Sequence, residues 1–257
     1  MTFKKVEFNP EKPVAQANCD KHGEYGSQHI IGRIWSPCPQ CMADSFAAEE
    51  KRIAEETRIE RIAAWERRIG QAGIPDRFRD RTLQSYQAAT DEQQKTLATC
   101  AKYAHHFDEV MKRGASLILC GKPGTGKTHL AVGIGLHAMH HFHSTVMFTT
   151  AMRMMRMVTD TYDRGSEKTV TRVVGELVFP DLLIIDEVGV QVGSDNEKRI
   201  FFDVLNERYE KRKPTIFLSN LDIAGVKSFL GERVYDRLKE DGCKYLSLDW
   251  ASYRGKK

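Results

Sequence analysis

Eight residues near the middle of the sequence read Gly121-Lys122-Pro123-Gly124-Thr125-Gly126-Lys127-Thr128. They match the pattern G-x-x-x-x-G-K-[ST] at every fixed position. Residues 117–120 before them form a short apolar run, and residues 130–134 after them continue as an apolar helix. This strand, loop and helix order separates a phosphate-binding loop from a glycine-rich turn that carries a lysine by chance. The sequence therefore predicts a nucleotide site.

The residue types of this loop suit ATP and Mg²⁺. The glycines let backbone N–H groups turn toward the phosphates. Lys127 supplies positive charge to the β and γ phosphates, and the hydroxyl of Thr128 can ligate Mg²⁺. We expect residues 121–128 to bind the nucleotide, with Lys127 acting in catalysis and Thr128 holding the metal.

A second apolar run, residues 181–187, ends in the acids Asp186 and Glu187, about sixty residues after the loop. We expect Asp186 to hold the Mg²⁺ hydration shell and Glu187 to polarise the attacking water, the two tasks that ATP hydrolysis adds to phosphate positioning. Asn220 follows another predicted strand at residues 215–220. Its amide could orient the same water, although asparagine is also favoured in turns.

The N-terminal part contains Cys19-x-x-His22 and Cys38-x-x-Cys41. Two such knuckles at this separation predict four ligands that converge on one Zn²⁺, and a closed four-ligand site is structural rather than catalytic. His29 is an alternative to His22. A C-x-x-C pair alone could be redox-active, but here it accompanies a second knuckle.

Composition divides the chain into three parts. Residues 1–42 form the predicted zinc module, in which residues 1–18 are expected to be a poorly ordered arm. Residues 43–72 are rich in Glu, Arg, Lys and Ala, which predicts an exposed linker helix. Residues 73–257 form the predicted ATPase domain.

The linker helix carries a narrow apolar stripe. Its members recur at helical spacing and are Ile59, Ile62, Trp65 and Ile69. The stripe has two interpretations: light packing of a solvated helix on its neighbour, or a docking face for a partner protein.

The remaining patterns complete an α/β domain with a central parallel sheet. Residues 91–113 predict a helix, residues 146–150 a strand and residues 244–248 a last strand. Residues 152–162 and 167–177 predict two helices; the methionines of the first either fill the core or form an adaptable binding surface.

Charge and hydropathy exclude some classes of protein. The net charge of +4 permits contact with nucleic acid without requiring it. No apolar run is long enough to span a membrane and no secretory signal is recognisable, so we expect a cytoplasmic protein. Cys100, Cys120 and Cys243 are scattered, as individual reduced thiols are.

Arg233 and Arg237 lie four residues apart in a predicted helix at residues 231–238. Both guanidinium groups would then project from one face, which suits a phosphate. A solvated helix face is the alternative.

The ordered set of motifs resembles the DnaC family of AAA+ ATPases, which load replicative helicases, and within it the phage and prophage members with an N-terminal zinc module. The resemblance runs from Gly73 to Arg254. It rests on Gly-Ile-Pro at 73–75, the P-loop, Ile-Ile-Asp-Glu at 184–187, Leu-Ser-Asn at 218–220, Gly-Glu-Arg-Val-Tyr-Asp-Arg-Leu at 231–238 and Trp-Ala-Ser-Tyr-Arg at 250–254.

The resemblance implies roles for individual residues. Asn220 resembles the sensor asparagine, Arg237 the arginine finger offered to a neighbouring subunit's ATP, and Arg254 the second sensor arginine. Arg233 would be an accessory phosphate contact. Residues 152–177 fall where members of the family carry a helical insertion that contacts single-stranded DNA.

The expected function is therefore ATP-dependent loading of a hexameric DnaB-type helicase onto single-stranded DNA. The subunits would assemble head to tail with ATP, and the N-terminal module would dock the helicase. Whether residues 19–69 make this contact is an open point, because family members without zinc bind the helicase through a helical N-terminal region. Hydrolysis would act as a switch. Two rivals are an IstB-like transposition helper ATPase, which would prefer double-stranded DNA and a transposase, and a nucleotide-gated adaptor.

Overall fold

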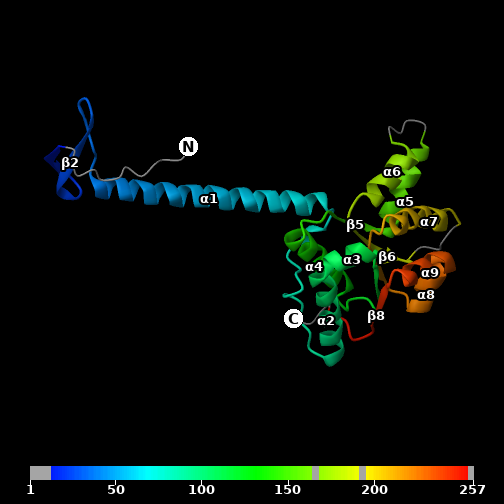
Figure 1. Ribbon diagram of the computed structural model, residues 1–257. Helices are drawn as coiled ribbons and strands as arrows, with labels where there is room; N and C mark the ends of the chain where they lie inside the picture. Colours follow the sequence, from blue (N-terminus) through cyan, green and yellow to red (C-terminus); the bar gives the residue numbers. More distant parts are fainter. Residues whose placement is uncertain (1–12, 164–167, 191–194, 254–257) are drawn as a thin grey trace. The chain divides into compact units, whose positions relative to one another are not determined.

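The computed structural model describes residues 13–163, 168–190 and 195–253, and for residues 195–198 the backbone alone. Two compact units, Met1–Glu66 and Arg67–Lys257, make up the chain (Figure 1). Helix α1 (Pro39–Gln71) spans the division between them. The division therefore falls inside the linker helix that the sequence predicts.

The N-terminal unit begins with a small antiparallel sheet. Strands β1 (Val14–Cys19), β2 (Gly23–Ile31) and β3 (Ile34–Trp35) lie in that order. In β1 exposed and half-buried side chains alternate, as in a strand with one covered face. The expectation of a poorly ordered arm up to residue 18 is wrong from Val14 onward, because residues Val14–Cys19 pair with β2 in an antiparallel ladder; residues 1–12 lie outside the described residues.

Helix α1 starts at Pro39, earlier than the predicted residue 43. Proline is well tolerated in the first turn of a helix because the missing N–H has no partner there. The helix is stabilised along its surface by pairs such as Arg52 with Glu49 and Glu56, at 2.6 and 3.0 Å. Its apolar stripe is divided: Ile59 is 57% exposed, whereas Ile69 is buried in the second unit.

The second unit is built on a five-stranded sheet in which neighbouring strands are parallel and the order is β5-β6-β7-β4-β8. The strands are β4 (Leu117–Gly121), β5 (Val146–Thr150), β6 (Leu182–Val188), β7 (Thr215–Ser219) and β8 (Lys244–Leu248). Strands β4 and β7 are buried along their whole length. Near-continuous apolar runs such as these are typical of strands covered on both faces.

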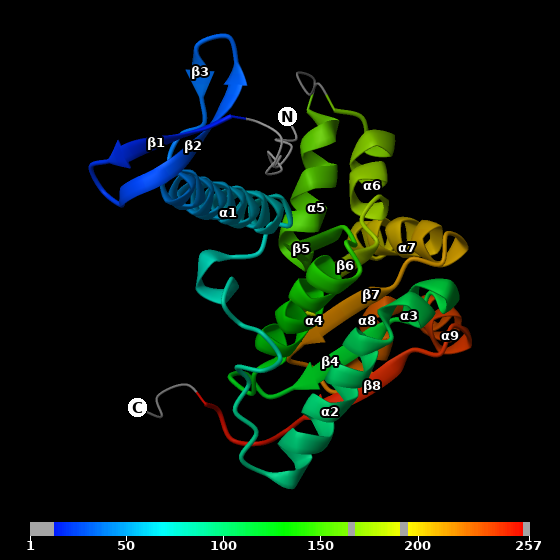
Figure 2. The same cartoon turned by 60° about the vertical axis from the view of Figure 1, so that its left-hand side comes forward.

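Helices cover both faces of this sheet (Figure 2). They are α2 (Asp91–His105), α3 (Phe107–Arg113), α4 (Lys127–His141), α5 (Ala151–Thr159), α6 (Val170–Val178), α7 (Asp195–Glu210), α8 (Ile223–Leu230) and α9 (Glu232–Glu240). Ile118, Leu183 and Phe217 point into the core formed with α5 to α9. On the other face α4 packs closely, with Gly135 against Ile184.

Several elements differ from the sequence expectation. The helix predicted for residues 91–113 is two helices, because the backbone of His106 leaves the helical region. Helices α7 and α8 were not expected. In α5, Met154 and Met155 are buried in the core, which supports the core-filling interpretation, while Met152 is 40% exposed.

Candidate nucleotide site and metal centre

The P-loop joins β4 to α4 in a conformation in which Gly121, Gly124 and Gly126 all have positive φ. Gly121 has φ +116°, and a Cβ atom there would lie 2.5 Å from the carbonyl oxygen of Leu248. Gly126, at φ +96°, is the residue before α4. The first N–H groups of α4 have no partner within the helix. They point into the loop, where an anion can accept their hydrogen bonds.

Lys127 lies inside this loop. Its Nζ is buried and donates hydrogen bonds of 2.7 Å to the carbonyl oxygens of Gly121 and Lys122. The hydroxyl of Thr125 donates to the same Lys122 carbonyl at 2.8 Å. The positive charge is therefore held where the predicted phosphates need it, while Lys122 and Pro123 are exposed at the surface of the loop.

The predicted metal ligands meet. The hydroxyl of Thr128 donates a 3.0 Å hydrogen bond to Asp186 Oδ2. Asp186 Oδ1 accepts the backbone N–H of Glu187 at 2.7 Å. A hydroxyl and a carboxylate at this distance are a suitable pair of oxygen donors for Mg²⁺.

Glu187 and Asn220 lie at the ends of neighbouring strands. Glu187 is exposed and has φ +60°, a strained value for a residue with a side chain, and such strain concentrates at functional sites. Strand β7 lies between β4 and β6, so Asn220, which follows β7, stands between the P-loop strand and the acidic strand. This position suits a residue that contacts a water near the γ phosphate.

The three predicted arginines differ in their surroundings. Arg233 is exposed on α9. Arg237 is half-buried, and its guanidinium lies 5.2 Å from the ring centre of Tyr209 and 5.8 Å from that of Phe202. One nitrogen of this group, Nη1, is buried with no hydrogen-bond partner among the described residues. Arg254 lies outside the described residues.

The two predicted knuckles of the N-terminal unit converge. The donor atoms of Cys19, His22, Cys38 and Cys41 lie within 4.8 Å of one another. Cys19 Sγ is 3.4 Å from Cys41 Sγ, and His22 Nδ1 is 3.3 Å from Cys41 Sγ. Three thiols and one imidazole form a donor set that suits tetrahedral Zn²⁺.

The contacts around these four donor atoms also favour metal binding. His22 Nε2 lies 3.3 Å from Asp44 Oδ2, the carboxylate–histidine arrangement that orients a ligating imidazole. Hydrogen bonding from the Lys21 backbone lowers the pKa of the Cys19 thiol to about 6, and Cys19 in turn raises the pKa of Cys41 to about 11. A cation between the two sulfurs would let both ionise. His29 is not part of this cluster, since its Nε2 lies 2.7 Å from the Gly32 carbonyl.

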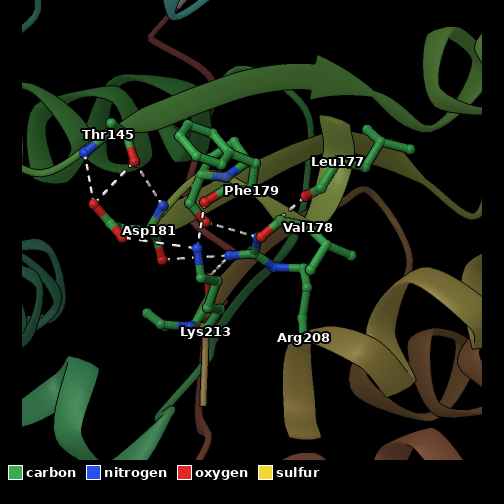
Figure 3. Close-up of polar contacts among 9 residues, drawn as sticks. Thr145, Leu177, Val178, Phe179, Asp181, Arg208 and Lys213 are labelled. Atoms are coloured by element: carbon green, nitrogen blue, oxygen red, sulfur yellow. Dashed lines mark hydrogen bonds and ion pairs between the residues drawn. The ribbon is translucent and has the colours of Figure 1, made fainter. Parts of the chain in front are cut away.

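Sequence reasoning missed a buried arginine (Figure 3). Arg208, on α7, is 1% exposed and donates hydrogen bonds to the carbonyls of Leu177, Val178, Pro180 and Pro214 and to the Thr215 hydroxyl. Burial lowers its pKa to about 9, which leaves it charged at neutral pH. Its partners lie at the end of α6 and around the amino-terminal ends of β6 and β7, whereas the P-loop and Asp186 lie at the carboxyl ends of β4 and β6. No motif indicates it.

Two aromatic residues beside the P-loop were also missed as site residues. Tyr86 and Trp250 each donate a hydrogen bond to the carbonyl of Thr125, at 3.1 and 3.0 Å. Tyr86 and Trp250 are 164 residues apart, in the first and last parts of the sequence of the second unit. Only the three-dimensional structure brings them to one atom.

Within the described residues no helix is both long and apolar enough to cross a membrane.

Comparison with known proteins defines the family. The sequence model of the IstB-like ATP binding proteins matches residues 47–257. The replicative helicase loader DnaC of Buchnera aphidicola subsp. Acyrthosiphon pisum (strain APS) is 37% identical over 208 residues, which are 80% of this chain and 83% of that protein. The chain therefore belongs to the family of IstB-like ATP-binding proteins, and the four candidate zinc ligands lie outside the residues that this sequence model matches.

Solved structures identify the fold. A crystal structure of the DnaC helicase loader superposes with a TM-score of 0.61 at 23% identity, over 68% of this chain and 100% of that one. The replication initiator DnaA bound to AMPPCP and single-stranded DNA gives a TM-score of 0.57 at 18% identity, over 69% of this chain and 51% of that one. The second unit thus has the AAA+ ATPase fold that the sequence predicted.

Proposed function

We propose that this chain is an ATP-dependent loader that places a hexameric DnaB-type helicase onto single-stranded DNA at the start of replication, in the cytoplasm. The observation that carries the proposal is the contact of Thr128 with Asp186 beside the P-loop, in a chain whose relatives are named replicative helicase loaders. The contact supports nucleotide binding, and the names of the relatives support helicase loading as the purpose for which the nucleotide is used.

The site would work through its own side chains. Lys127 would contact the β and γ phosphates, and Thr128 and Asp186 would hold Mg²⁺, which supplies charge neutralisation. Glu187 would polarise the attacking water, with Asn220 orienting it. Hydrolysis would release an assembly that ATP stabilises.

Neighbouring subunits would complete each site. Arg237, Arg233 and Arg254 are the candidates for contacts with phosphates, and a head-to-tail assembly would carry the arginine finger to the next subunit's ATP. Arg233 supports this role by its exposure on α9. Arg237 supports it by the unpartnered Nη1, although its aromatic neighbours have to yield for the side chain to extend.

Single-stranded DNA would lie against the α5 and α6 pair. Arg153 and Arg156 are exposed on α5, near the exposed Met152. Guanidinium groups beside apolar side chains suit phosphates and bases together. Because phosphate contacts release counterions, DNA binding should weaken as salt rises.

The N-terminal unit would dock the helicase. Its β2–β3 hairpin exposes Ile31, Ile34 and Trp35, at 68%, 59% and 41%. Apolar side chains exposed together in this way are typical of protein interaction sites. Zn²⁺ held by Cys19, His22, Cys38 and Cys41 would stabilise a segment too small to bury a core of its own.

The test is co-purification of the full chain with a replicative DnaB-type helicase in ATP and Mg²⁺. Ile34→Asp should release the helicase, and Val14→Asp, at the opposite edge strand, serves as the matched control. A wild-type chain that never retains the helicase would overturn the loader function.

The family description favours one alternative function, that of an IstB-like transposition helper. Preference for double-stranded DNA and retention of a transposase would support it. A nucleotide-gated adaptor would instead remain active in Glu187→Gln, which should bind ATP without hydrolysing it.

A further inference from the structure

The carbonyl groups of the P-loop are held by residues outside the loop. The Thr125 carbonyl accepts hydrogen bonds from Tyr86 Oη at 3.1 Å and from Trp250 Nε1 at 3.0 Å. The carbonyl of Gly124 accepts the backbone N–H of Tyr253 at 2.9 Å. The chain that follows β8, red in Figure 2, thus contacts the loop at two successive peptide groups.

The geometry of the peptide group links these contacts to phosphate binding. In a trans peptide the C=O and the following N–H point in opposite directions. Fixing the Thr125 carbonyl therefore fixes the N–H of Gly126, and fixing the Gly124 carbonyl fixes the N–H of Thr125. Backbone N–H groups of such a loop are the donors that cradle phosphates. Their orientation is thus set before ATP arrives.

Packing around the loop supports the same conclusion. Thr125 is 2% exposed, so its carbonyl has little access to water as an alternative donor. A Cβ atom on Gly126 would lie 2.6 Å from Tyr86 Cε2, which shows how closely the ring covers the loop. Burial raises the pKa of Tyr86 to about 12, so the phenol remains a donor at neutral pH.

The two donor segments also contact each other. Tyr253 Oη donates a 2.8 Å hydrogen bond to Gln87 Oε1, next to Tyr86 in the chain. The Tyr86 ring lies edge-on to His129 of α4, with 5.2 Å between ring centres. The segments that contain Tyr86 and Tyr253 are therefore joined to each other as well as to the loop.

We propose that Tyr86 and Trp250 are positioning residues of the nucleotide site: they hold the Thr125 peptide so that the N–H groups of the P-loop face the phosphates. The proposal rests on the proposed ATP site. It adds that the C-terminal segment controls affinity for ATP, and that the Trp250 indole reports on occupancy of the loop.

The experiment compares Tyr86→Phe, Trp250→Phe and the double variant in the full chain. Calorimetric titration with ATP and Mg²⁺ measures Kd, and steady-state hydrolysis separates KM from kcat. Each single variant should weaken ATP binding about fivefold, the net value of one neutral hydrogen bond, with kcat nearly unchanged. The double variant should lose more than the product of the two, because a buried carbonyl is then left without any donor.

Two further measurements make the test specific. The unfolding midpoint without nucleotide should stay close to wild type in Tyr86→Phe, which removes one oxygen and keeps the ring. ATP should change tryptophan emission in wild type and in the control Trp35→Phe, and should leave it unchanged in Trp250→Phe.

Wild-type affinity in the double variant would overturn the inference and leave the proposed function intact. If kcat and the unfolding midpoint fell together with the affinity for ATP, the inference would also be overturned, because such a pattern indicates that the residues only stabilise the fold. A wild-type chain that binds no ATP would overturn both the inference and the proposed function.

Discussion

Thr128 and Asp186 are 58 residues apart in sequence, and the threonine hydroxyl lies 3.0 Å from the carboxylate. Thr128 lies in the first turn of α4, which follows β4, and Asp186 lies on β6, with β7 between these two strands. The contact therefore joins the start of α4 to a strand that does not pair with β4. It brings both predicted Mg²⁺ ligands to one place.

Glu187→Gln should separate binding from hydrolysis. The amide keeps the shape of the side chain but cannot accept a proton, so the rate of ATP hydrolysis should fall about 10²- to 10⁴-fold, with Kd for ATP nearly unchanged. Phosphate release and calorimetry measure the two quantities. Glu92→Gln, an exposed acid at the start of α2, is the control. A variant that hydrolyses ATP at the wild-type rate would exclude Glu187 as the base.

Asp44→Ala should weaken zinc binding without removing a ligand. The Asp44 carboxylate lies 3.3 Å from His22 Nε2 and orients the ring, and loss of such partners costs about 10- to 100-fold in metal affinity. Competition with a chromogenic chelator measures the affinity. Asp20→Ala, an exposed acid beside Cys19, should have no effect. A purified chain that holds no zinc under reducing conditions would contradict the prediction.

Local patterns indicated the P-loop and the cluster of cysteines and histidine because each motif fixes its residues within a short stretch. The P-loop depends on glycine conformations, and the knuckles on two-residue spacing. Sheet pairing and helix geometry bring Cys19 close to Cys41 and Thr128 close to Asp186. The spacing of the motifs only implied these contacts. The strand predictions succeeded for a similar reason, since buried parallel strands are short apolar runs.

Tertiary contacts without a motif could not be predicted in this way. Arg208 lies on α7, which was not expected from the sequence, and only the carbonyls that surround its guanidinium explain its burial. Tyr86 and Trp250 meet at one carbonyl oxygen from opposite ends of the second unit.

Arg208→Met should destabilise the second unit by about 3 kcal/mol or more, because several buried carbonyls lose their donor at once. Arg208→Lys should recover part of this loss, since an ammonium can donate to some of the same oxygens. Urea unfolding measures the free energy. Lys211→Met removes an exposed pair with Glu207 on the same helix and should change it by less than about 1 kcal/mol. If both Arg208 variants were as stable as wild type, Arg208 would not stabilise the second unit, and the prediction would be wrong.

Arg237→Ala and Lys127→Ala should complement each other if the arginine acts in a neighbouring subunit. Each variant alone should hydrolyse ATP poorly. In a mixture, an intact P-loop from one subunit can meet an intact arginine from the other, so activity should return in part. Arg233→Ala mixed in the same way tests which arginine of α9 is the finger. Failure of every mixture would favour a role within one subunit.

His137 should make the second unit sensitive to mild acid. Its ring lies among His105 and His141, with ring centres 4.7 and 4.2 Å away, and burial followed by repulsion from these neighbours lowers its pKa from 6.5 to about 4. Because the folded state binds the proton less tightly than the unfolded state, this contribution to stability is present above pH 6.5 and is lost as the pH falls toward 4.

Solvent screening of this half-buried group limits the effect to about 1 kcal/mol. Urea midpoints at pH 7.5 and pH 5 should therefore differ more for wild type than for His137→Gln. The control is His143→Asn, which removes a histidine outside the cluster at a position with φ +54° that asparagine tolerates. An equal pH dependence in wild type and His137→Gln would show that the acids, rather than this cluster, account for the loss. The cluster joins α2 to the helix that carries the P-loop, so its protonation should also weaken ATP binding over the same interval of pH.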